Sequence, residues 1–216
     1  MRRVFSALLV TLVFLGGSTA GAELILTATM TNAQENPPAV PTTSTGDPRA
    51  ASFGTALFTL NDAMTSMTFT ATVFNIDFTG TQTADPNDNL TAAHIHAGPT
   101  AVPGTNAGVV WGFFGAPFND NNPNDAVVSP FASGVGGMIS GKWDALEGNN
   151  TTLAAQLANI LNNQSYINFH TVQFGGGEVR GQIEPVPEPA TMLTVGLGVA
   201  ALVRGARRRG VNRERC

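Results

Sequence analysis

Residues 67–73 read MTFTATV, and this short stretch decides the fold class. Successive side chains of a β-strand point to opposite faces, so the apolar side chains share one face and the threonines share the other. The apolar set is Met67, Phe69, Ala71 and Val73. A helix would mix the two classes around its circumference. The stretch therefore predicts a strand with one face in a core and the other in solvent.

Similar short runs, separated by turn residues, fill the surrounding region. They predict further strands over 24–30, 53–60, 92–96, 109–114, 136–142, 166–172 and 177–183. One helix is expected after Asn150 or Thr151, where apolar residues recur on one face. The stretches 78–90 and 115–134, rich in Asn, Asp, Pro and Gly, are expected to be long loops. We therefore expect a mainly β fold, an antiparallel β-sandwich or a Greek-key barrel with one short helix.

The N-terminal residues 1–22 have the pattern of a cleavable signal peptide. Arginines precede an apolar run over 4–15, and small residues follow it, with Ala20 and Ala22 at the two positions that a signal peptidase reads. We expect the Sec machinery to export the chain and cleavage to occur before Glu23. An uncleaved N-terminal helix is the alternative, disfavoured by the shortness of the apolar run.

The C-terminus carries a second apolar segment with a different flank. Val186, Pro187, Glu188 and Pro189 precede an apolar stretch over 190–203, and Arg207, Arg208 and Arg209 follow it. This order resembles a PEP-CTERM sorting segment, here 186–210 with a short tail over 211–216. The resemblance implies recognition by an exosortase, a membrane protease that cuts near the Pro-Glu-Pro triplet.

The apolar stretch is short for a membrane anchor. As a helix its 14 residues would measure about 21 Å, against a hydrocarbon core of about 30 Å. The arginines would stay on the cytoplasmic side. A short transmembrane helix suits an inner-membrane-anchored intermediate that is then released to the cell surface. A permanent C-terminal anchor is the alternative.

The region between the two ends is long enough for one domain and strongly acidic. Residues 23–186 hold three basic and thirteen acidic side chains, a net charge of −10. Nucleic acid is therefore excluded as a partner, because binding it requires a basic surface. The one cysteine, Cys216, is the last residue, so this region has neither a disulfide nor a thiolate ligand.

Three motifs of the β domain, 23–185, resemble the CHRD domain first described in chordin. They are LTA and NAQENPP at 26–28 and 32–38, AHIHAG at 93–98, and YINFHT and GEVRGQ at 166–171 and 177–182. The resemblance implies an immunoglobulin-like, superoxide-dismutase-like β fold and no established biochemical activity. The loops after Asp77 and over 118–131 are longer than the family minimum.

All three histidines of the chain lie in these motifs. On a strand, His94 and His96 share one face and Ile95 points to the other, so Ile95 is expected in the core and the imidazoles outside the barrel wall. A hairpin closed over glycines 175–177 would add His170 as a third imidazole.

The same hairpin would place Glu178 opposite His170 and Arg180 opposite Asn168. Two interpretations stay open. The favoured one is a hydrogen-bonded polar cluster of the histidines, Glu178 and Arg180 that pins loops to the barrel. The other is a Cu or Zn site with the three histidines as ligands and Glu178 orienting one of them. Superoxide dismutation is disfavoured, because it would need a bridging histidine and further ligands.

We expect no catalytic residues and no enzymatic activity, since the chain has neither a phosphate-binding loop nor a nucleophile elbow. The first hypothesis is an exported bacterial protein of the cell surface or extracellular matrix with a binding or structural role. Its expected partners are the exosortase, the Sec machinery, the membrane and exopolysaccharide. The alternative is a metal-binding protein or metal-dependent enzyme that uses His94, His96 and His170.

Overall fold

The expected mainly β fold is confirmed. The computed structural model describes residues 23–187. The strands are β1 (Leu24–Thr31), β2 (Phe53–Leu60), β3 (Ser66–Phe74), β4 (Leu90–Ala97), β5 (Val109–Phe114), β6 (Val127–Pro130), β7 (Gly136–Asp144), β8 (Ser165–Thr171), β9 (Val179–Gln182) and β10 (Glu184–Pro185). The helix α1 spans Leu153–Leu161, and two short 3-10 helices, η1 (Asn32–Gln34) and η2 (Pro86–Asp88), lie in the connections.

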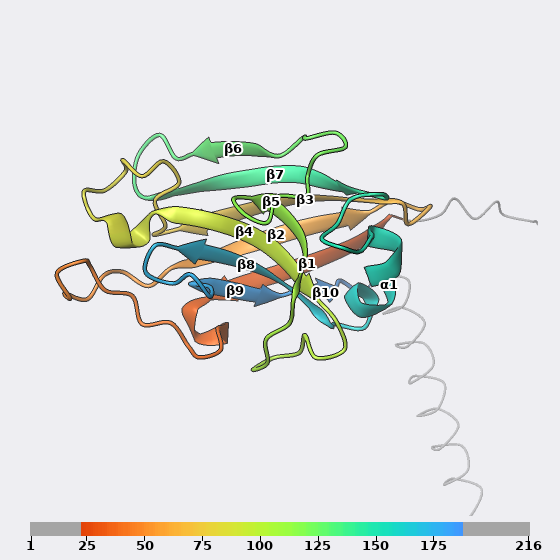
Figure 1. The fold of residues 1–216 in the computed structure, drawn as a ribbon, viewed down its shortest axis with the longest axis horizontal. Coiled ribbons are helices and arrows are strands. Elements are labelled where there is room, and N and C mark those ends of the chain that lie inside the picture. Colours follow the sequence, from red (N-terminus) through yellow and green to blue (C-terminus); the bar gives the residue numbers. More distant parts are fainter. Residues whose placement is uncertain (1–22, 188–216) are drawn as a thin grey trace, which may run out of the picture.

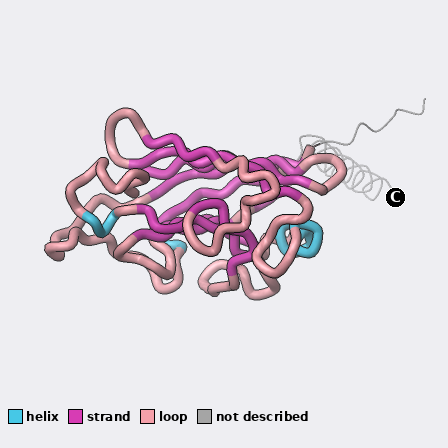
Figure 2. Tube along the Cα trace, turned by 45° about the horizontal axis from the view of Figure 1, so that its top comes forward, coloured by secondary structure: helices cyan, strands magenta, loops and turns pink. Residues whose placement is uncertain are grey.

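All these strands join one antiparallel sheet that curls on itself (Figures 1 and 2). Its order is β5-β4-β8-β9-β1-β2-β3-β7-β6, with β10 paired to β1. Trp111 of β5 stacks on Trp143 of β7 at 5.5 Å between ring centroids and meets Phe69 of β3 edge-on at 5.6 Å. Neither β3 nor β7 is hydrogen-bonded to β5. The curled sheet therefore encloses one aromatic core, as a sandwich or barrel does.

The alternation in residues 67–73 determines which face of β3 enters that core. All four apolar side chains of the stretch are at most 3 % exposed. The threonines between them point outward. β3 pairs with β2 on one side and with β7 on the other, so it is a central strand of its half of the sheet.

Two local expectations were wrong. A fourth strand of this half, β6, forms inside the stretch 115–134 that was expected to be a loop, because it pairs along the edge of β7 with Val128 opposite Ile139. Four residues at an edge are too few to show an alternating pattern. The second is the helix cap, which is Thr152 and not Asn150 or Thr151 as expected; Oγ1 of Thr152 accepts from the N–H of Ala155 at 3.3 Å.

The expected targeting segments lie mainly outside the described residues. These segments are the signal peptide 1–22 with Ala20 and Ala22, the C-terminal apolar helix, Glu188, Pro189, and Arg207 to Arg209. Val186 and Pro187 end the described part, and the Val186 N–H donates to the Ile25 carbonyl at 2.9 Å. Within 23–187 no helix is both long and apolar enough to cross a membrane.

Candidate metal centre

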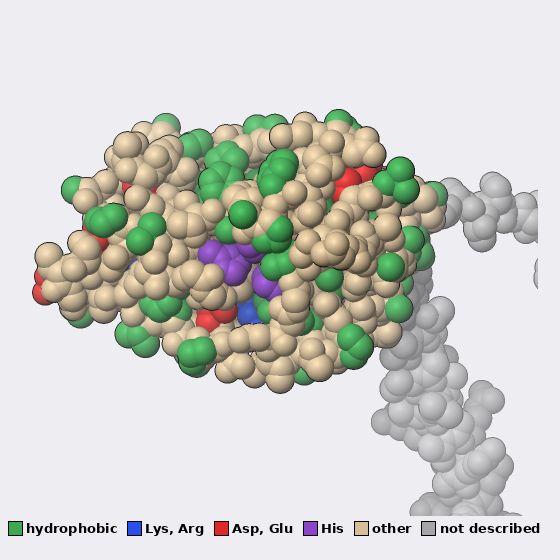
Figure 3. Space-filling view, viewed as in Figure 1, with side chains coloured by type: hydrophobic (Ala, Val, Ile, Leu, Met, Phe, Trp, Pro, Cys, Tyr) green, Lys and Arg blue, Asp and Glu red, His purple; other side chains and the backbone are tan. Residues whose placement is uncertain are grey.

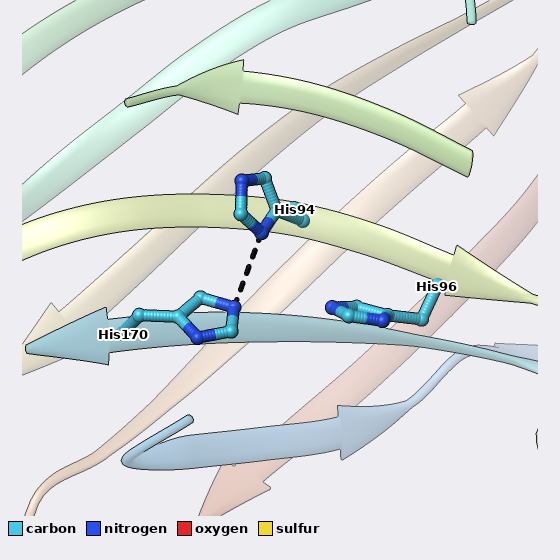
Figure 4. Close-up of side chains that lie close together, drawn as sticks. All are labelled: His94, His96 and His170. Carbon is cyan, nitrogen blue, oxygen red and sulfur yellow. Dashed lines mark hydrogen bonds between the residues drawn. The ribbon is translucent and has the colours of Figure 1, made fainter. Parts of the chain in front are cut away.

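Strand alternation places three imidazoles on the outer side of the curled sheet. On β4, Ile95 enters the core while His94 and His96 point the other way. On β8, Phe169 enters the core and His170 points outward. β4 and β8 are adjacent and antiparallel, so the three side chains meet. Figure 4 shows one ring nitrogen of His96 pointing toward the other two rings.

Loops bury this cluster although it lies outside the barrel wall. The three histidines are only 3–7 % exposed. The loop after β5 approaches so closely that a Cβ at Gly112 would lie 1.8 Å from the Pro117 carbonyl oxygen. Glycine at this position therefore lets the loop cover His94. Figure 3 shows the imidazoles at the bottom of a hollow, which gives an ion a path to them.

The hydrogen bonds around the cluster determine where its lone pairs point. Nδ1 of His96 lies 2.9 Å from the Ala107 carbonyl, and Nδ1 of His170 lies 3.1 Å from the Gly175 carbonyl. A carbonyl only accepts, so both Nδ1 atoms carry a proton and both Nε2 atoms present a lone pair. Nδ1 of His94 lies 3.1 Å from Nε2 of His170. Nε2 of His94 and Nε2 of His96 have no hydrogen-bond partner.

This geometry fits a metal ion. One ligand nitrogen from each histidine lies within 4.8 Å of the other two. Imidazole nitrogens lie about 2.0–2.1 Å from zinc, so two ligands in a tetrahedral site are about 3.3 Å apart. The 3.1 Å between His94 and His170 is close to that value, and His96 has to move inward slightly. In the metal-free chain the His94 Nδ1–H donates to His170. For Nδ1 to bind an ion, that proton would have to move to Nε2 of His94, which keeps the ligand neutral. Imidazole ligands suit copper and zinc.

Burial keeps the three imidazoles neutral, which leaves their lone pairs available to a metal. Burial, reinforced by the neighbouring histidines, lowers the pKa of His94 to about 3. Burial lowers the pKa of His96 to about 4 and also lowers the pKa of His170. Protons therefore compete with a metal for these nitrogens only at a pH well below the usual pKa of histidine.

Arg180 lies beside the cluster and is separated from it by an aromatic ring. Its guanidinium carbon is 3.5 Å from the centroid of the Tyr166 ring. That ring stacks in turn on His96, with 4.6 Å between centroids and 7° between planes. Asn168 is opposite Arg180 in the β8–β9 hairpin, as the motif spacing predicted.

Glu178 does not join the cluster, although it was expected to orient one of the histidines. Its carboxylate accepts from Arg49 at 2.5 Å, from Thr171 at 2.6 Å and from Ser52. No hydrogen bond joins it to a histidine among residues 23–187. Glu178 is fully buried, and with Arg49 it forms an ion pair that fastens the 42–52 segment to the hairpin.

A buried carboxyl that the motif spacing did not single out as functional lies next to this face. Glu35 is 6 % exposed, and its Oε1 and the Oδ1 of Asn168 both lack a hydrogen-bond partner. Both side chains crowd Gly177, where a Cβ would lie within 2.7 Å of each. Burial raises the pKa of Glu35 to about 7. A protonated Glu35 could donate to Asn168 and satisfy both atoms. The only signal of it in the sequence is an acid inside the NAQENPP motif.

Replacing Glu35 with glutamine is expected to stabilise the protein more at pH 8 than at pH 4. The unfolded chain ionises Glu35 near 4.5 and the folded chain near 7, so wild-type stability falls as pH rises through this interval. The neutral amide avoids that loss, which amounts to roughly 2–4 kcal/mol. Urea unfolding of both proteins at pH 4 and pH 8 measures the difference in their free energies of unfolding. An equal difference between Glu35→Gln and wild type at pH 4 and pH 8 would contradict the assignment.

Comparison with known families agrees with the motifs. The family model of the CHRD domain matches residues 26–183. The model of the PEP-CTERM protein-sorting motif matches residues 185–209. No curated protein and no solved structure matches the chain. The CHRD match spans all three histidines and both strands that carry them.

Proposed function

This chain belongs to the CHRD domain family, and from that premise we propose that it is a non-enzymatic surface protein whose β domain binds a copper or zinc ion through His94, His96 and His170. The PEP-CTERM motif implies processing by an exosortase, export and sorting to the cell surface through a membrane-anchored intermediate. The domain would thus present its metal site outside the cytoplasm. The role is binding or carrying the ion, with no reaction attached to it.

The observation that carries the metal proposal is that three buried imidazole nitrogens converge and that one of them has no hydrogen-bond partner. Buried polar atoms are normally hydrogen-bonded, and a structural polar cluster would pair its members. Here Nε2 of His96 is buried without a partner and points toward the other two rings, where Nδ1 of His94 and Nε2 of His170 face each other 3.1 Å apart. A polar cluster that only pins loops gives no reason for the unpaired nitrogen of His96. A metal ion held by these three nitrogens accounts for it.

Metal loading of the full chain tests the proposal. The purified protein should take up one equivalent of copper or zinc by elemental analysis. Free metal at about 100 times its dissociation constant should raise the melting temperature by roughly 5–11 °C. Magnesium, which prefers oxygen ligands, should leave it unchanged. Less than about 0.1 equivalent bound, with no thermal shift, would favour the pinned polar cluster instead.

Replacing Pro187, Glu188 and Pro189 together with alanine tests the sorting step. Since the triplet lies in the matched motif, the variant should remain in the membrane fraction at full length, whereas wild type is released in a shorter form. Immunoblots of membrane and surface fractions measure this. If wild type and the variant were both released and had the same mass, that result would contradict processing at the triplet.

A further inference from the structure

The ligand set of the candidate site carries no charge of its own. All three ligands are imidazoles, and two of them are oriented by the backbone carbonyls of Ala107 and Gly175. Many metal-bound histidines are instead held by a carboxylate, which offsets part of the ion's charge. Within 23–187 no carboxylate hydrogen-bonds any of the three rings. The full charge of a bound ion would therefore stay uncompensated in a buried place.

A fixed positive charge lies close to this place. Arg180 is 1 % exposed and donates to the carbonyls of Thr105 at 2.7 Å and Val102 at 3.0 Å. β8 lies between β4 and β9, so Arg180 and His96 stack on opposite faces of the Tyr166 ring. The two stacking distances place the guanidinium about 8 Å from the His96 ring.

No ion pair in the described part of the chain involves Arg180. The ion pairs there join Arg49 to Glu178, and Lys142 to Asp125 and Asp144. Arg49 already pairs with Glu178, the buried acid of the hairpin. Burial raises the pKa of Glu35 to about 7 although the Arg180 charge lowers it, so Glu35 offsets the Arg180 charge only above that pH.

We propose that the site selects monovalent copper, Cu(I), over divalent copper and zinc, and that Arg180 is the residue that enforces this choice. The inference rests on the proposed metal function. The cost of burying an ion grows with the square of its charge, so three neutral ligands favour a single charge over two. The guanidinium is about 8 Å from the His96 ring and somewhat farther from an ion held by that ring. It repels a divalent ion twice as strongly as a monovalent one, which at roughly 10 Å and an effective dielectric constant of about 20 adds about a tenfold preference.

Anaerobic competition with a Cu(I)-specific chromophoric chelator, and matched competition for Zn(II), measure the preference in the full chain. Cu(I) should bind at least about 100-fold more tightly than Zn(II), combining the two electrostatic contributions. Equal or tighter Zn(II) binding would overturn this inference and leave the proposed metal function standing. Absence of binding by either ion would overturn the proposed function and the inference with it.

Two substitutions of Arg180 separate charge from packing. Arg180→Gln and Arg180→Lys both lose contacts to the 102–105 loop, but only the lysine variant keeps the charge. We expect Arg180→Gln to lower the Cu(II)/Cu(I) midpoint potential by at least about 59 mV, a tenfold change in relative affinity, and Arg180→Lys to lower it by less than half of that. Equal shifts in the two variants would overturn the role of charge. If Arg180→Gln does not fold, the lysine variant and the wild-type affinity ratio still decide the inference.

Discussion

Replacing His170 with alanine should weaken copper or zinc binding by at least about 100-fold, since losing even a residue that only orients a ligand costs 10–100-fold. His170 contributes one of the two closest nitrogens, 3.1 Å from Nδ1 of His94. Removing it leaves two imidazoles and no other ligand in the group. Competition titration of the full chain measures the loss.

Two further measurements distinguish the loss of a ligand from misfolding of the His170→Ala variant. His96→Gln keeps a side chain of similar size and should lose affinity by a similar factor. Because burial holds the pKa of His94 near 3 and the pKa of His96 near 4, wild type should retain its metal at pH 5. Exposed histidines would release it near pH 6.5. Unchanged affinity in both variants would place the metal elsewhere on the chain.

Replacing Glu178 with alanine should lower the free energy of unfolding by about 3–5 kcal/mol, because it leaves the Arg49 charge without a partner in a buried place. The side chain of Arg49 is 9 % exposed and that of Glu178 is 0 % exposed. Two other groups, the hydroxyls of Ser52 and Thr171, would lose an acceptor at the same time. Urea denaturation measures the change.

Lys142 offers a matched control for this ion pair. Its ammonium lies 3.1 Å from Asp144 and 3.4 Å from Asp125, but its side chain is 34 % exposed. Lys142→Ala should therefore cost less than about 1 kcal/mol. The double variant Arg49→Ala, Glu178→Ala should lose less stability than the two single losses added together. A cost for Glu178→Ala no larger than that for Lys142→Ala would contradict the structural role of this pair.

Local periodicity explains why so much of the fold could be predicted from the sequence. A period of two is visible within seven residues, so β3 and its inward face follow from Met67 to Val73 alone. The same rule placed His94 and His96 outside the core and Ile95 within it. The β8–β9 register followed from the hairpin, with Asn168 opposite Arg180.

Long-range partners explain what could not be predicted. The Arg49–Glu178 pair joins residues 129 positions apart, and nothing in the local sequence of either residue indicates the other. Glu178 follows the hairpin glycines ahead of β9, so strand alternation did not govern its side chain. Glu35 likewise meets Asn168 only because the first loop folds across β8 and β9. Which loop covers a face depends on tertiary packing.

X-ray absorption spectroscopy of the copper-loaded full chain tests the central claim most directly. We expect about three nitrogen neighbours near 2.0 Å with the multiple scattering of imidazole rings, and a loss of this signal in His170→Ala, which no longer holds the ion tightly. A spectrum dominated by oxygen neighbours, or one that is identical in wild type and variant, would show that His94, His96 and His170 do not hold the ion.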